Sequence, residues 1–122
     1  MAANETVQAY AAAWLEPAED KRRELLIQAW TDDGTYTDPM LHVVGRDALN
    51  QMITAFQQRR PGDRIVLTSG VDQHHSVLRF AWKWYAADGS SKMEGTDFGE
   101  LASDGRLCRI VGFFGPVPDL AD

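Results

Sequence analysis

An aspartate occupies a position that strand alternation predicts to be apolar. Met93, Gly95, Asp97, Gly99 and Leu101 lie two residues apart in the segment SKMEGTDFGEL and so share one face of a strand. Burying an ionised carboxylate without a partner is costly, so we expect Asp97 to be protonated or hydrogen-bonded. A protonated acid in a pocket could donate a hydrogen bond to a substrate. The alternative is a structural bond to Tyr10 or to an indole nitrogen.

A second aspartate, Asp38, stands in the segment Thr-Asp-Pro at the end of a short predicted strand, 34–39. A carboxylate at the mouth of an apolar cavity gains proton affinity through desolvation and becomes a useful general base. An aspartate before proline also forms turns in which its side chain accepts hydrogen bonds from backbone amides. Both interpretations of Asp38 stay open at this level.

Three further side chains, those of Tyr10, His74 and His75, are of types that can take part in catalysis or bind a metal ion. Tyr10 lies on the inner face of the first predicted helix, where core packing with a satisfied hydroxyl competes with a catalytic role. His74 and His75 are neighbours on a strand, so they point to opposite faces and cannot easily bind one metal ion. The parity of His74 with Trp82 is compatible with a position at the pocket rim, and the alternative, which we favour, is a structural or solvent-exposed histidine. We expect no metal and no cofactor, because clustered metal ligands, a phosphate-binding loop and a GxSxG elbow are absent from the sequence.

Three helices precede the strands. The first is predicted around Val7–Trp14 with Asn4 as its cap, and the second begins with Pro17 in its first turn and ends before Asp33. Leu25, Leu26, Ala29 and Trp30 would form the apolar side of the second helix. The third carries Leu49, Met52, Ile53 and Phe56 and ends at 59–62.

Strands are predicted near 63–72, 75–86, 92–101 and 106–114, where β-branched and aromatic residues alternate with polar ones. The links AADGSS and ASDG are typical of hairpin turns, which make an antiparallel meander. Leu78, Phe80, Trp82 and Trp84 should face the helices, and Cys108, Ile110, Gly112 and Phe114 should share one face of the last strand. Helices followed by a sheet indicate an α+β fold.

Composition narrows the possible functions. The chain has 122 residues, so one domain covering 1–122 is expected, and its net charge of −6 argues against a nucleic-acid partner. No stretch approaches the roughly twenty apolar residues that span a bilayer, and the N-terminus lacks the pattern of a signal peptide. The single cysteine, Cys108, is predicted to be a small buried thiol. We therefore expect a cytoplasmic protein without a membrane partner.

Taken together, the motifs resemble the nuclear-transport-factor-two-like superfamily, specifically its SnoaL-like branch, which includes polyketide cyclases and is related to ketosteroid isomerases. The resemblance rests on VQAYAAAW, AWTDDGTYTDP followed by VGRDALNQMI, RFAWKWY, and GTDFGELASDGRLCRIVGFFG, and it covers nearly the whole chain. It implies a cone-shaped α+β barrel, with three N-terminal helices packed in the concave face of a curved, mainly antiparallel sheet. Such proteins are often dimeric through the outer sheet face.

The narrower resemblance to ketosteroid isomerases implies roles for three residues. Ketosteroid isomerases use an Asp as the base, and a Tyr and a protonated Asp as oxyanion donors. By motif, the base falls on Asp38, the tyrosine on Tyr10 and the protonated acid on Asp97, which is also the position matching the acid/base of polyketide-cyclase-like relatives. The predicted pocket-lining residues are Trp14, Trp30, Tyr36, Met40, Met52, Phe56, His74, Phe80, Trp82, Trp84 and Phe114.

Two functional hypotheses follow from these residues. The first is a cofactor-independent enzyme that moves a proton on a small, largely apolar carbonyl compound, as an isomerase or cyclase does. The second is a non-catalytic ligand-binding or dimerising module of the same fold. An epoxide hydrolase is a third option, but it would need an Asp-Arg-Asp arrangement that the sequence does not place. A homodimer is expected through the outer set Val77, Ala81, Tyr85, Phe98, Val111 and Phe113.

Overall fold

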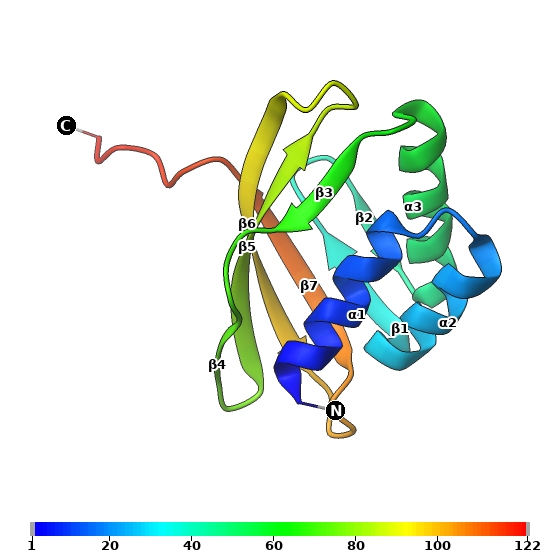
Figure 1. The fold of residues 1–122 in the computed structure, drawn as a ribbon. Helices are drawn as coiled ribbons and strands as arrows, with labels where there is room; N and C mark the ends of the chain where they lie inside the picture. The colour runs from blue at the N-terminus through cyan, green and yellow to red at the C-terminus, as the bar shows by residue number, and fades with distance from the viewer. Residues whose placement is uncertain (1, 122) are drawn as a thin grey trace.

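Three helices lie in the concave side of a curved sheet in the computed structural model, which describes residues 2–121 (Figure 1). The helices are α1 (Ala3–Leu15), α2 (Glu19–Ala29) and α3 (Arg46–Arg59). The strands are β1 (Trp30–Thr37), β2 (His42–Val44), β3 (Arg64–Leu67), β4 (Asp72–His74), β5 (Val77–Tyr85), β6 (Ser91–Leu101) and β7 (Leu107–Phe114). The predicted α+β class and its cone shape are confirmed, although the seven-stranded sheet is open and does not close into a barrel.

The sheet is mixed. Its order is β2-β1-β7-β6-β5-β3, with β4 paired to β5 beside β3. β5, β6 and β7 form the predicted antiparallel meander, joined by the two predicted hairpin turns. β1 runs parallel to β7, and the long segment between them, which includes α3 and the other strands, supplies the crossover connection that a parallel pair requires. This pairing brings residues near position 37 beside residues near position 111.

The predicted inner faces of the two central strands are confirmed. Leu78, Phe80 and Trp82 are buried on β5, and on β6 Gly95, Asp97 and Gly99 are buried while the residues between them are not. Glycines make room for their large cross-strand neighbours. Trp82 pairs with Gly95, where a Cβ would collide with the indole ring, and Asp97 pairs with Gly112.

One face assignment was wrong at the start of β7. Leu107 is fully buried there, whereas Cys108 is only half-buried and its thiol lies against the carbonyl of Glu100. The register shifts between Glu100 and Leu101, so a bulge turns Leu107 inward in place of Cys108. Burial, followed by the charge of Glu100, raises the pKa of the Cys108 thiol.

Several element boundaries also differ from the prediction. α1 begins at Ala3, so Asn4 lies within the helix rather than capping it, and Pro17 precedes α2 instead of sitting in its first turn. α2 ends at Ala29, and Trp30 already belongs to β1. The predicted strand 63–72 is divided into β3 and the first residue of β4, and the short β2 was not predicted. Strong hydrophobic periodicity locates elements better than it locates their ends.

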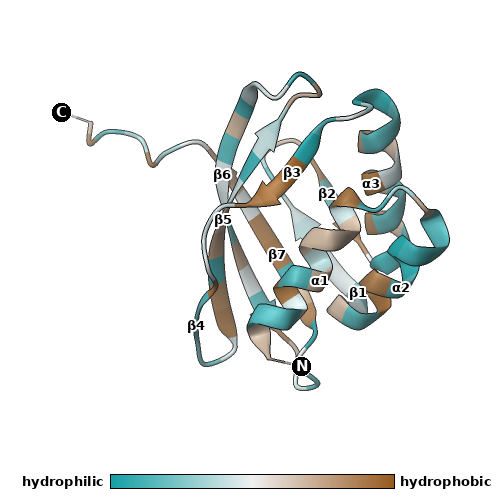
Figure 2. Ribbon diagram, in the orientation of Figure 1, coloured by the Kyte–Doolittle hydropathy of each residue, from teal (hydrophilic) through white to brown (hydrophobic). Residues whose placement is uncertain are grey.

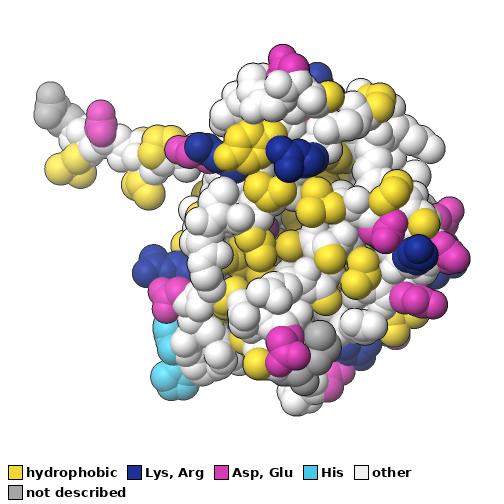
Figure 3. All heavy atoms as spheres, viewed as in Figure 1, with side chains coloured by type: hydrophobic (Ala, Val, Ile, Leu, Met, Phe, Trp, Pro, Cys, Tyr) yellow, Lys and Arg dark blue, Asp and Glu magenta, His cyan; other side chains and the backbone are white. Residues whose placement is uncertain are grey.

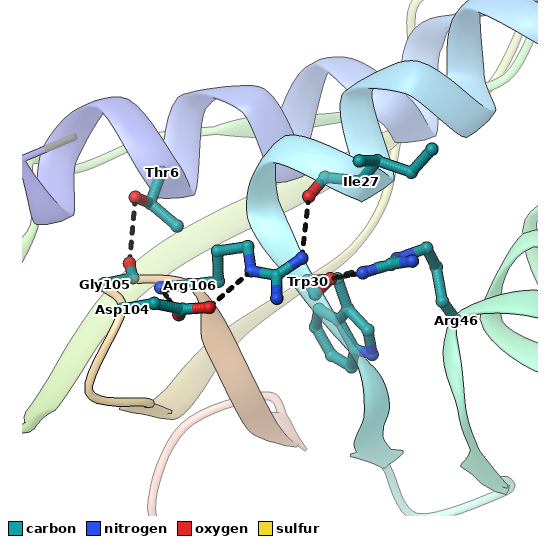
Figure 4. Close-up of polar contacts among 7 residues, drawn as sticks. All are labelled: Thr6, Ile27, Trp30, Arg46, Asp104, Gly105 and Arg106. Carbon is teal, nitrogen blue, oxygen red and sulfur yellow. Dashed lines mark hydrogen bonds and ion pairs between the residues drawn. The ribbon is translucent and has the colours of Figure 1, made fainter.

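Polar contacts join the helices to β1 and to the turn that precedes β7 (Figure 4). The Thr6 hydroxyl donates to the Gly105 carbonyl at 3.2 Å, and the Arg106 guanidinium donates to the Ile27 carbonyl at 3.2 Å. Arg46 of α3 donates to the Trp30 carbonyl at 2.6 and 3.0 Å.

Hydrophobic residues concentrate on β3 and β7, whereas α2 and the end of α3 are largely hydrophilic (Figure 2). Within residues 2–121, no helix is both long enough and apolar enough to cross a membrane.

Candidate active-site cavity

A cavity of about 370 Å³ opens between the helices and the concave face of the sheet. Hydrophobic side chains gather around the hollow between α1 and β3 (Figure 3). Twelve residues named from the sequence line this cavity: Tyr10, Trp14, Tyr36, Asp38, Met40, Met52, Phe56, Phe80, Trp82, Trp84, Asp97 and Phe114. Its volume lies at the lower end of the range of about 300–1,000 Å³ typical of small-molecule pockets.

Two predicted lining residues lie elsewhere. Trp30 is fully buried in the core, where its ring stacks on Tyr10 with centroids 5.4 Å apart, because it starts β1 at the end remote from the cavity. His74 is exposed on the short edge strand β4, and its Nδ1 lies 3.1 Å from Nδ1 of His75. β4 pairs only with the first residues of β5, which keeps His74 away from the cavity.

Aromatic rings form one continuous wall of the cavity. Trp84 packs edge-on against Phe56 with centroids 5.4 Å apart, and Phe56 packs edge-on against Trp14 at 5.7 Å. Trp14 in turn meets Tyr36 at 6.2 Å. Such a wall exposes few polar atoms to the cavity. The polar groups that do reach the cavity therefore have few competitors for hydrogen bonds with a ligand.

Asp97 is the more buried of the two acids that line the cavity, with 6% of its surface exposed. Its Oδ1 accepts a hydrogen bond from the Trp82 indole nitrogen at 2.9 Å, which is one of the structural bonds considered from the sequence. The pKa of Asp97 is raised to about 7, chiefly by burial; the hydrogen bond from Trp82 lowers it, and the charge of Asp38 raises it. Near neutral pH this carboxyl therefore exists in both protonation states.

Asp38 is half-buried and accepts three hydrogen bonds. The Tyr36 hydroxyl donates to Oδ2 at 2.7 Å, and the backbone amides of Met40 and Leu41 donate to Oδ1 at 2.8 and 2.9 Å. The hydrogen bonds from the two backbone amides are those of the turn considered from the sequence. The hydrogen bond from the Tyr36 hydroxyl connects Asp38 to the cavity. Asp38 thus has both a structural role in the loop and access to the cavity.

Asp38 and Asp97 both lie close to Gly112. A Cβ placed on that glycine would be 2.8 Å from Oδ1 of Asp97 and 3.5 Å from Cβ of Asp38. Gly112 pairs with Asp97 on β6, while the parallel pairing of β1 with β7 brings the end of β1 alongside. A side chain at position 112 would therefore collide with the Asp97 carboxyl and contact Asp38.

Two tyrosines complete the polar part of the cavity. Burial, followed by the charge of Asp97, raises the pKa of Tyr10, while a hydrogen bond with the Trp14 side chain lowers it. Burial and the neighbouring Tyr10 also raise the pKa of Tyr36. Both hydroxyls therefore stay protonated at neutral pH and can donate hydrogen bonds.

Sequence reasoning missed part of the lining. Ala11, Leu41, Arg59, Arg60, Ile65, Val66, Leu67 and Met93 also border the cavity. Met93 shares parity with Asp97, which was a usable signal. Arg59 and Arg60 were interpreted only as the end of a helix, and nothing local in the sequence shows that this end borders the cavity. Among residues 2–121, no three His, Cys, Asp or Glu side chains gather into a group that could hold a metal ion.

A curved open sheet with three helices in its concave face defines the cone-shaped fold of the NTF2-like proteins. One such protein of unknown function, from Exiguobacterium sp. 255-15, superposes with a TM-score of 0.73 over 92% of this chain and 99% of its own, at 19% identity. A SnoaL-like family protein from Agrobacterium tumefaciens str. C58, proposed to be an isomerase, is 37% identical, with a TM-score of 0.86 over 92% of this chain and 96% of its own. The chain belongs to the SnoaL-like family.

A more distant similarity extends to a SnoaL-like protein from Jannaschia sp. CCS1 that is proposed to be a polyketide cyclase. It is 13% identical, with a TM-score of 0.68 over 89% of this chain and 84% of its own. At this identity the similarity shows the fold alone. No protein-family model matches the sequence, and the search of curated proteins finds no match.

Proposed function

We propose that the protein binds a small, largely apolar carbonyl compound in this cavity and moves a proton on it without a cofactor. The observation that carries the proposal is that two carboxyl groups and a tyrosine hydroxyl converge on one aromatic cavity. Pairs of carboxyl groups in unlike environments are typical of sites that use one as an acid and the other as a base. The isomerase proposed for the Agrobacterium relative supports the same class of reaction.

In this proposal Asp38 is the base. Its carboxylate takes a proton from the carbon beside the substrate carbonyl, the C–H bond breaks, and the electron pair moves onto the carbonyl oxygen. Protonated Asp97 and Tyr10 donate hydrogen bonds to that oxygen. Asp38 then returns the proton to a different carbon, which completes an isomerisation. Preorganised donors of this kind each contribute about 10²–10³-fold to rate in well-studied enzymes.

A variant of the mechanism gives the acid/base role to Asp97. Its pKa of about 7 lies near the working pH, where a general acid or base is most effective. Asp38, held by Tyr36 and two backbone amides, would then orient the substrate. A cyclase reaction, as proposed for the Jannaschia protein, would also use a single acid/base at this place.

The reaction can be tested with a β,γ-unsaturated cyclohexenone, whose conversion into the conjugated ketone is followed by ultraviolet absorbance. We expect Asp38→Asn to lower kcat/KM by at least about 10²-fold, because the amide cannot accept the proton. Tyr10→Phe and Asp97→Asn should lower kcat more than they change KM. Asp32→Asn is the matched control, since Asp32 is exposed on β1 and outside the cavity.

The activities that Asp38→Asn and Asp97→Asn retain show which of the two aspartates is the acid/base. If Asp97→Asn abolishes turnover while Asp38→Asn retains most of it, the acid/base is Asp97. In the parent protein, a kcat/KM that rises with pH through a pKa near 7 would support Asp97 as the base, whereas a kcat/KM that falls there would support protonated Asp97 as a hydrogen-bond donor. Deuterium exchange from D2O into the substrate, followed by NMR, detects proton removal even where no isomer accumulates.

A non-catalytic binding module is the second candidate. It is favoured by the bonds of Asp38 to the Met40 and Leu41 amides, which explain that residue without any chemistry. Under this hypothesis the parent protein and Asp38→Asn would bind the same ketone with equal affinity, and neither would exchange its protons. That combination of results would exclude the enzymatic proposal for this substrate class.

A further inference from the structure

Two arginines border the cavity where it opens to solvent. Arg59 and Arg60 end α3 and are both exposed, yet both belong to the cavity lining. The lining residue Met40 is also exposed, at 79%, so the mouth of the cavity lies between the end of α3 and the loop after β1. Positive charge at this mouth is notable in a chain whose net charge is −6.

These two guanidinium groups lack the acceptors that most arginines of this chain possess. Within residues 2–121, six arginines donate to a carboxylate, an amide, a hydroxyl or a carbonyl: Arg22, Arg23, Arg46, Arg79, Arg106 and Arg109. No hydrogen bond or ion pair is found for Arg59, Arg60 or Arg64 in this part of the chain, and of these three only Arg64 is outside the cavity lining. The donors of Arg59 and Arg60 are therefore available to a ligand.

Arg60 is held in place by an aromatic neighbour. Its guanidinium carbon lies 5.5 Å from the centroid of the Trp84 ring, which is a cation–π contact with a wall of the cavity. Asp63, the carboxylate bound to the same indole ring, accepts from the Trp84 indole nitrogen at 2.9 Å and from the Ala87 amide at 2.9 Å. Trp84 therefore orients Arg60 without neutralising its charge, and the N–H donors of the planar guanidinium stay free for a second partner.

We propose that the ligand of this cavity carries an anionic group, a carboxylate in its simplest form, which Arg59 and Arg60 bind at the mouth while the apolar body enters between the aromatic rings. The inference rests on the function proposed above and specifies its substrate class. An arginine suits a carboxylate because two parallel N–H groups of its guanidinium donate to the two carboxylate oxygens. The same arrangement also fixes orientation, since the arginines attract the carboxylate to the mouth while the aromatic rings accept the apolar body.

The test compares two compounds of nearly equal shape, phenylbutanoate and its neutral amide, by titration calorimetry at low ionic strength. We expect the carboxylate to bind about tenfold more tightly than the amide, as charge-assisted hydrogen bonds at a partly exposed site allow. Added salt should reduce this ratio, because the arginines are accessible to counterions. The double variant Arg59→Gln/Arg60→Gln should bring the ratio close to one while leaving the affinity for the amide within about twofold.

Arg64→Gln is the matched control. Arg64 also stacks on an aromatic ring, with its guanidinium carbon 5.6 Å from the centroid of Tyr85, but it does not border the cavity. Its variant should keep the tenfold ratio. An equal affinity of the parent for the two compounds, or a ratio that survives in the double variant, would overturn the anionic ligand and leave the proposed proton transfer standing. If neither compound binds, the anionic ligand is overturned, while the proposed proton transfer is decided separately by the cyclohexenone assay.

Discussion

The protonation of Asp97 links the cavity to the stability of the fold. Burial raises its pKa from the ordinary value of 3.8 to about 7, so between these two pH values the native state keeps a proton that the unfolded chain has released. The free energy of unfolding that this group contributes is complete below about pH 4 and is lost progressively as the pH rises to about 7. A difference of this size corresponds to about 4 kcal/mol at most.

Asp97→Asn should remove that dependence. The amide stays neutral at every pH and its oxygen can still accept the Trp82 indole hydrogen bond, so the cavity wall is preserved. Urea unfolding at pH 5 and pH 8 should show the parent losing clearly more stability than the variant over this interval. Asp119→Asn, which removes an exposed carboxyl from the C-terminal segment, should behave like the parent. Parallel losses in the parent and Asp97→Asn would show that Asp97 does not titrate in this range.

Individual residues were predictable where the signal was local. Alternation along β6 was enough to place Asp97 on the apolar face, and the Asp-Pro step was enough to suggest the turn around Asp38. The bond from Tyr36 to Asp38 also had a local signal, because residues two apart on a strand share a face. The meeting of Asp38 and Asp97 beside Gly112 had none, since it depends on pairing between the two ends of the chain.

At the level of elements, a buried arginine joins all three helices. Arg22 of α2 is 2% exposed and donates to the Glu16 carbonyl that follows α1, at 2.9 Å. On α3 it donates to Asn50 at 2.6 Å, to Gln57 at 3.1 Å and to the Thr54 hydroxyl. All four acceptors are neutral, so the charge is stabilised by hydrogen bonds alone. Because α3 carries part of the cavity wall, this network also fixes one side of the cavity.

We expect Arg22→Ala to lower the free energy of unfolding by about 3 kcal/mol or more, since it leaves several buried acceptors without donors. Arg23→Ala is the control on the adjacent position. Arg23 is exposed in a pair with Glu19, and its loss should cost under about 0.5 kcal/mol. Urea unfolding at one pH measures both. A similar small loss for the two variants would mean that the network adds little to the native state.

The elements themselves were largely predictable, but their connections were not. Periodicity gave the three helices and the β5-β6-β7 meander, because these depend on neighbours in the chain. The parallel pairing of β1 with β7 and the short β2 depend on contacts distant in sequence. Trp30 illustrates the limit. Its spacing from Leu26 fits a helix, yet the carbonyl bonds to Arg46 and the stacking on Tyr10 favour the first residue of a strand.

At the scale of the whole molecule, the outer face of the sheet carries an exposed apolar patch. Phe98 on β6 and Phe113 on β7 are 45% and 55% exposed, and their rings meet edge-on with centroids 5.9 Å apart. Val77, 37% exposed on β5, belongs to the same face. Ion pairs flank the patch: Arg79–Asp72, Lys83–Glu94 and Arg109–Glu100. An apolar centre with a charged border containing both signs is the composition of a self-complementary interface.

We propose that two copies of the chain associate through this patch, burying the phenylalanines against each other and aligning the charged borders. Phe98→Glu combined with Phe113→Glu should convert a dimer into a monomer, because each copy would then bring two carboxylates to the centre of the interface. Light scattering coupled to size-exclusion chromatography at micromolar concentration measures the mass directly. Ile27→Glu is the matched control, since Ile27 is 48% exposed on α2, far from this sheet face, and its variant should keep the dimer mass. A monomeric mass for the parent protein would exclude the interface. A dimer that survives in the double variant would place the contact on another surface of the molecule.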